Sequence, residues 1–153
     1  MITEQIAQDL KQALLAGDTE RVTVLRGLKT AITYAEVAMG KKGTGLSDEE
    51  ILSIFQKEVK KRQDSVDAYT KAGSPERAEQ EAREQAIIQR YLPQQLSEAA
   101  VRELVDAAIV ATGASGLRDM GRVIGVVKQK AGASADGSMI ARLAKQRLEE
   151  HAA

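Results

Sequence analysis

The stretch ITEQIAQDLKQALLAGDTERVTVLRGLKTAITYAEVAMG at residues 2–40 predicts two amphipathic helices in succession. Its first apolar residues recur every four positions, which places them on one helical face: Ile2, Ile6, Leu10 and Leu14. Gly17 is suited to a C-terminal cap and Asp18 to the N-terminal cap of the next helix. A second apolar stripe then runs from Val22 to Met39. The stretch therefore predicts a helical hairpin.

The same helix signals recur along the rest of the chain. Residues 47–50, SDEE, form a capping box that opens a helix ending at Gly73. A further helix begins at Pro75 and is stopped by Pro93. Three shorter helical patterns follow, beginning near Ser97, Leu117 and Asp136.

These patterns predict an all-α fold in two parts. We expect an N-terminal antiparallel unit of about four helices over residues 1–93 and a small three-helix C-terminal domain over residues 94–153. The composition agrees, since aromatic residues make up only 3% of the chain and two prolines are present.

Composition also bounds the function. The 22 basic and 22 acidic residues give a net charge of zero, so the whole chain is not a strongly basic nucleic-acid-binding protein. There is no cysteine, which excludes disulfides and thiolate chemistry. No apolar run is long enough to span a bilayer, so no membrane partner is expected. The start MITEQ lacks the pattern of a secretion signal, and we expect a cytoplasmic protein.

No catalytic or metal-binding residue is predicted. The only histidine is His151, near the C-terminus, where a Ser-His-Asp arrangement would not be held. Zinc would need cysteines or several histidines. The glycine-rich loop at residues 40–45 follows a helix and carries its lysines before the last glycines, which favours a flexible connector over a phosphate-binding loop. No cofactor is expected.

Arg62 occupies the apolar stripe of its helix. Its stem could pack while the guanidinium reaches the edge, or it could make an internal ion pair or contact a ligand. Glu58 lies four residues before it, a spacing typical of surface ion pairs on a helix.

The strongest charge asymmetry lies between residues 118 and 147, where seven basic residues face two acidic ones. The basic residues are Arg118, Arg122, Lys128, Lys130, Arg142, Lys145 and Arg147. A basic face on two short helices is suited to phosphate contacts. The alternative is a solvated face balanced by the acidic helix that precedes it.

Gly121 and Gly125 are four residues apart within a predicted helix. Each costs about 1 kcal/mol relative to alanine. The spacing predicts a close approach of another backbone on that face, either by packing within the chain, which we favour, or by a nucleic-acid backbone.

Several segments together resemble the YqeY-like family, which is related to the tail of the GatB subunit of the tRNA-dependent amidotransferase. The segments are YLPQQLS at residues 91–97, DMGRVIG at 119–125, ADG at 135–137, LRGLK at 25–29 and EVKKRQDS at 58–65. The resemblance covers nearly the whole chain. It implies an all-α fold with a longer helical N-terminal part and a three-helix C-terminal part.

The resemblance also implies an accessory, non-catalytic tRNA-binding function, with the seven basic residues contacting phosphates and no DNA partner. Two alternatives stay open: a module that docks an amidotransferase or aminoacyl-tRNA synthetase subunit, and a carbon–nitrogen ligase or amidase that uses glutamine. The family commonly carries a basic residue where this chain has Ala133 and Ser134, so one possible phosphate contact is missing.

Overall fold

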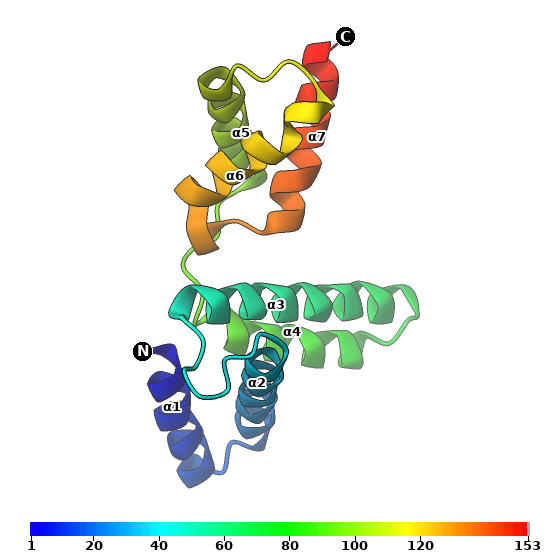
Figure 1. The fold of residues 1–153 in the computed structure, drawn as a ribbon. Helices are drawn as coiled ribbons and strands as arrows, with labels where there is room; N and C mark the ends of the chain where they lie inside the picture. The colour runs from blue at the N-terminus through cyan, green and yellow to red at the C-terminus, as the bar shows by residue number, and fades with distance from the viewer. Residues whose placement is uncertain (153) are drawn as a thin grey trace. The chain divides into compact units, whose positions relative to one another are not determined.

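The structure is a computed structural model that describes residues 1–152. Within that range it contains seven α-helices, two short 3₁₀ helices and no strand, which confirms the predicted all-α class (Figure 1). The α-helices are α1 (Ile2–Ala16), α2 (Thr19–Ala38), α3 (Asp48–Lys71), α4 (Pro75–Gln89), α5 (Glu98–Thr112), α6 (Met120–Ala131) and α7 (Gly137–Ala152). The 3₁₀ helices are η1 (Leu117–Asp119) and η2 (Gly132–Ser134). The chain divides into two compact units, Met1–Leu92 and a second that begins at Pro93.

Local capping chemistry sets the helix ends. Gly17 ends α1 in the left-handed conformation, with φ of 69°, and the Asp18 carboxylate accepts a hydrogen bond from the Arg21 backbone N–H at 3.1 Å. Ser47 and Glu50 form the predicted capping box at the start of α3. These contacts satisfy backbone groups that a helix end leaves without partners.

In the first unit, α1 packs against α2, and α2 contacts the antiparallel pair α3 and α4 (Figure 1). Phe55 lies fully buried at the centre and meets the Tyr91 ring edge-on, at 5.8 Å between centroids. The Tyr91 hydroxyl donates to the Asp9 carboxylate, which fastens α1 to the segment after α4. Burial, reinforced by Asp9, raises the pKa of Tyr91 well above its usual value, so this hydroxyl keeps its proton.

Arg62 makes an internal ion pair between α3 and α4. Its guanidinium contacts Glu84 and, at 3.3 Å, Glu81, and its side chain is 26% exposed. The expected partner Glu58 instead binds Lys61 at 3.1 Å. Of the alternatives open for Arg62, the ion pair is therefore correct, and the ion pair expected with Glu58 is wrong.

The glycine-rich connector before α3 is hydrogen-bonded. The Lys41 backbone N–H donates to the Glu36 carbonyl at 2.7 Å, and that of Gly45 donates to the Lys41 carbonyl at 2.8 Å. The Lys41 ammonium contacts Glu50, and Leu46 is buried. One lysine of this loop therefore serves the capping box of α3.

In the second unit, each of α5, α6 and α7 contacts the other two around an apolar core. Its fully buried members include Val101, Val105, Val123, Val127, Ile140, Leu143 and Leu148. The segment before α5 holds the turn η2, because the Gln95 side chain donates to the Ala133 carbonyl at 2.9 Å. Among the described helices, none combines the length and the hydropathy needed to cross a membrane.

Candidate functional site

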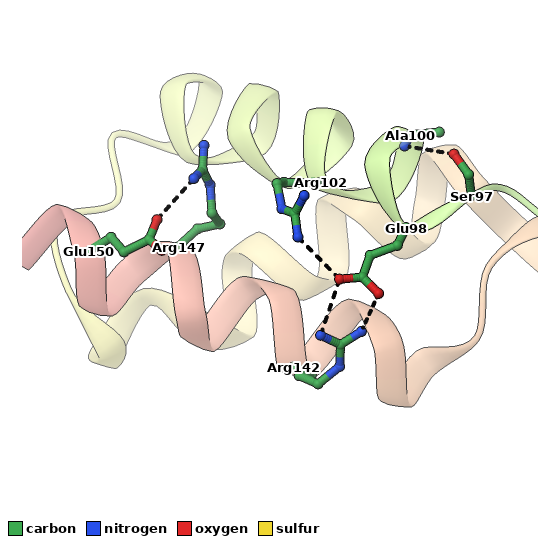
Figure 2. A network of polar contacts seen from close by, with 7 residues as sticks. All are labelled: Ser97, Glu98, Ala100, Arg102, Arg142, Arg147 and Glu150. Atoms are coloured by element: carbon green, nitrogen blue, oxygen red, sulfur yellow. Dashed lines mark hydrogen bonds and ion pairs between the residues drawn. The ribbon is translucent and has the colours of Figure 1, made fainter.

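Two of the predicted phosphate-binding arginines are engaged by the acidic helix α5. The Arg142 guanidinium donates to both Glu98 oxygens, at 3.4 and 3.0 Å, as Figure 2 shows. Arg147 donates to both Asp106 oxygens at 2.7 Å. It also pairs with Glu150 at 2.9 Å (Figure 2). For these two residues the structure bears out the alternative of a basic face balanced by its acidic neighbour.

The pKa shifts at these pairs have the direction that such contacts produce. The hydrogen bond from Arg142 lowers the pKa of Glu98, and that from Arg147 lowers the pKa of Asp106. The hydrogen bond to Asp106 also raises the pKa of Arg147. Both pairs therefore stay charged and mutually neutralising near neutral pH.

A third arginine is engaged locally. Arg122 contacts Asp119 at 2.6 Å, while Asp119 also accepts the Ser115 backbone N–H at 3.0 Å. The Ser115 hydrogen bond, followed by that of Arg122, lowers the pKa of Asp119. Four exposed cations have no ion pair with any described residue: Arg118, Lys128, Lys130 and Lys145. Phosphate binding by the seven basic residues stays a prediction of the sequence.

Gly121 and Gly125 lie on the exposed face of α6. A Cβ built at either glycine would meet no atom within 4 Å, apart from the neighbouring residues of its own helix. The favoured explanation, close packing within the chain, is therefore wrong for the residues described. Approach by another molecule stays a prediction.

Two open hollows, which together we call the groove, lie along the α1–α2 hairpin. One hollow is lined by Ala13, Leu14, Gly17, Thr19, Val22, Thr23 and Arg26. A second hollow is lined by Thr3, Ile6, Lys29, Ile32, Thr33 and Glu36. The first hollow adjoins the turn that joins α1 to α2, and the second lies between the first turns of α1 and the C-terminal half of α2.

The floor of this groove is apolar and its margin is unusually exposed. Ile6, Ala13 and Ile32 are buried at its base. Leu14 in the wall is 51% exposed, and its neighbour Leu15 is 81% exposed. Six of the eight large apolar side chains that are exposed in residues 1–152 lie on or beside this hairpin: Met1, Leu14, Leu15, Tyr34, Val37 and Met39.

Sequence reasoning missed this groove, although a signal was present. Leu14 and Leu15 are adjacent, and successive residues of a helix point about 100° apart, so a narrow apolar stripe cannot bury both. The basic residues Arg26 and Lys29 belong to no charge cluster, so they were noted only as part of the LRGLK segment. Metal ligands offer no competing site, since the described residues contain no group of three or more His, Cys, Asp or Glu placed to hold an ion.

The family model described as Yqey-like protein matches residues 3–148, nearly the whole length. The chain belongs to the YqeY-like family. The match confirms the resemblance to this family that the sequence segments suggested.

Curated relatives of this YqeY-like protein carry the name Altered inheritance of mitochondria protein 41, mitochondrial. The relative from Kluyveromyces lactis is 33% identical over 105 residues, which is 69% of this chain and 55% of the relative. That from Lachancea thermotolerans is 32% identical over 89 residues, 58% of this chain and 46% of the relative. The matched part therefore spans about half the length of these relatives.

These comparisons correct two expectations. The relatives are named for mitochondrial inheritance, and neither their names nor the family description mentions tRNA or an amidotransferase, so the tRNA-binding accessory function and the association with an amidotransferase or synthetase are contradicted. The ion pairs of Arg142 and Arg147 supply a physical reason why counting basic residues misled. The expected cytoplasmic location is contradicted as well, because the relatives are named as mitochondrial proteins.

Proposed function

We propose that this YqeY-like protein is a protein-binding module whose α1–α2 groove receives a helix of a partner protein. The observation that carries the proposal is the concentration of exposed apolar side chains on this one hairpin, beside a groove with an apolar floor. Exposed apolar surface rimmed by polar residues is a feature of interaction sites. A pair of helices that leaves such a groove open presents the surface that helix-in-groove recognition uses.

The packing of the hairpin supports this proposal. α2 is covered on one side by α3 and α4, whereas α1 packs principally against α2. A third helix in the groove would shield Leu14 and extend the buried cluster around Ile6 and Ile32. Burying apolar side chains in this way stabilises a complex by roughly 25 cal/mol per Å² of apolar area.

The names of the relatives neither supply nor restrict the partner. They speak of mitochondria and of inheritance, and they name no ligand or reaction. The proposal therefore rests on the surface of this chain alone.

Site-specific photo-crosslinking in living cells tests the proposal. A photoreactive residue placed at Thr23, which is exposed and lines the first hollow, should form an adduct with another protein, and one placed at the exposed Glu79 of α4 should not. The variant Leu14→Gln, which keeps a good helix former at a half-exposed site in the same hollow, should diminish the Thr23 adduct. Equal adducts at both positions, or none at Thr23, would contradict the proposal.

We also propose that the two compact units are separate domains, with four helices in residues 1–93 and three in residues 94–153. The proposal is supported by the separate apolar clusters of the two units. Expression of residues 94–153 alone tests it, and a helical fragment that unfolds cooperatively is expected.

A further inference from the structure

We infer that the occupant of the α1–α2 groove is an amphipathic helix that presents carboxylates to Arg26 and Lys29, between two apolar anchors that fill the two hollows. This inference rests on the proposed function and adds the chemistry of the partner. It follows from where the charges of the hairpin lie and which of them the chain itself already uses.

Three of the five acidic residues of the hairpin are engaged by the chain. Asp9 contacts Tyr91 and, at 3.6 Å, Arg21. Glu20 pairs with Arg83 at 3.3 Å, and Asp18, which stands between two residues that line the first hollow, caps α2. The other two are Glu4, which is exposed and lines neither hollow, and Glu36.

The cations of the groove are left without such partners. Arg26 lines one hollow and Lys29 the other, and both are exposed. Neither forms an ion pair within the described residues. The only carboxylate that lines either hollow is Glu36, at the end of the groove farther from Arg26 along α2. The two cations therefore lie between Asp18, at the turn end of the groove, and Glu36, at its other end.

The spacing along α2 defines the partner. Arg26 and Lys29 are three residues apart, about 5 Å along the axis at the helical rise, which suits two acidic residues three or four positions apart on a partner helix. Val22 and Ile32 mark the two hollows, ten residues apart and hence about 15 Å along the axis. Apolar anchors ten or eleven residues apart on the partner, with the acidic pair between them, match this arrangement.

Glu36 adds a requirement on the ends of that helix. An acidic residue opposite Glu36 would be repelled, so the partner should be neutral or basic there. α1 has 15 residues, so the groove beside it is about 22 Å long, and a partner helix of about four turns fills it.

A pair of synthetic helical peptides tests the inference against the full chain. Both carry leucine anchors eleven residues apart, and the acidic peptide has two glutamates between them where the basic peptide has two lysines. We expect the acidic peptide to bind about tenfold more tightly at low salt, the advantage shrinking as salt rises. The double variant R26E and K29E should reverse this preference, and the matched control K57E, on the exposed side of α3, should leave it unchanged.

The possible results separate the two proposals. Equal binding of both peptides, weakened by Leu14→Gln, would overturn the charge inference and leave the protein-binding groove intact. Binding of neither peptide would also overturn the inference, and only if the Thr23 crosslink were absent as well would the proposed function fail. Sedimentation could instead show that the protein is a dimer and that Leu14→Gln dissociates it. That result would identify a second copy of the chain as the occupant of the groove and would overturn the inference of an acidic partner helix.

Discussion

Replacing Gly125 with alanine should stabilise the second unit, although the sequence suggests that this glycine is required. Gly125 lies in the interior of α6, its face is exposed, and a Cβ there meets nothing within 4 Å. Alanine then gains the difference in helix propensity without any steric cost. Gly121 is the second residue of α6, so alanine there should gain less than at Gly125.

The expected gain is about 1 kcal/mol for Gly125→Ala, since the new methyl meets no neighbour, and a smaller further gain for the double variant with Gly121→Ala. For a unit of this size, 1 kcal/mol corresponds to roughly 4–8 °C in Tm. Urea unfolding followed by circular dichroism, with Tm from calorimetry, measures both quantities.

Two control variants make the result decisive. Gly27→Ala, at an equally open position in α2, should stabilise the first unit to a similar degree. Gly113→Ala should destabilise the second unit by about 1 kcal/mol, because Gly113 ends α5 with φ of 66°. If Gly125→Ala were destabilising while Gly27→Ala was not, an atom of the chain would have to approach Gly125, and the open face described above would be wrong.

Three further predictions concern polar contacts. Arg62→Met should cost about 1–2 kcal/mol of unfolding free energy in a urea titration, because two glutamates of α4 lose their shared partner at a partly buried site. Tyr91→Phe should keep the ring packing and lose the hydrogen bond to Asp9, costing about 1 kcal/mol in the same assay. The pKa values of Glu98 and Asp106 are lowered in the folded protein, so the unfolded chain binds protons first on acidification. The stabilising contribution of these pairs should therefore be complete at neutral pH and be lost as the pH drops below about 4. Denaturation at a series of pH values measures this loss.

The features that depend on neighbouring residues were predictable from the sequence. A glycine after an apolar stripe, as at Gly17, and a serine three residues before a glutamate, as at Ser47, act through hydrogen bonds within one turn. No tertiary contact is needed to satisfy them. The helix order, and with it the all-α class, therefore followed from local signals.

The ion pairs depended on contacts that spacing cannot supply. Arg62 has a carboxylate four residues away at Glu58, yet the packing of α3 on α4 brings it Glu81 and Glu84 instead. Arg142 and Glu98 are 44 residues apart and meet only because α5 packs against α7. A count of charges along the chain treats such residues as independent, which is why the apparent excess of positive charge overstated the free cations.

The groove, like the ion pairs, could not be predicted from the spacing of residues along the chain. The apolar stripe of α2 identifies the residues that need burial, but not which neighbour buries each edge of the stripe. On one edge α3 and α4 complete the core, while on the other α1 covers Ile32 and leaves a hollow beside Thr33 and Lys29. The spacing of apolar residues is the same whether the chain itself buries the stripe or leaves it open to a partner. Only the three-dimensional packing distinguishes the two cases. The adjacent residues Leu14 and Leu15, which a narrow apolar stripe cannot bury together, were the one sign in the sequence that apolar side chains of α1 stay exposed.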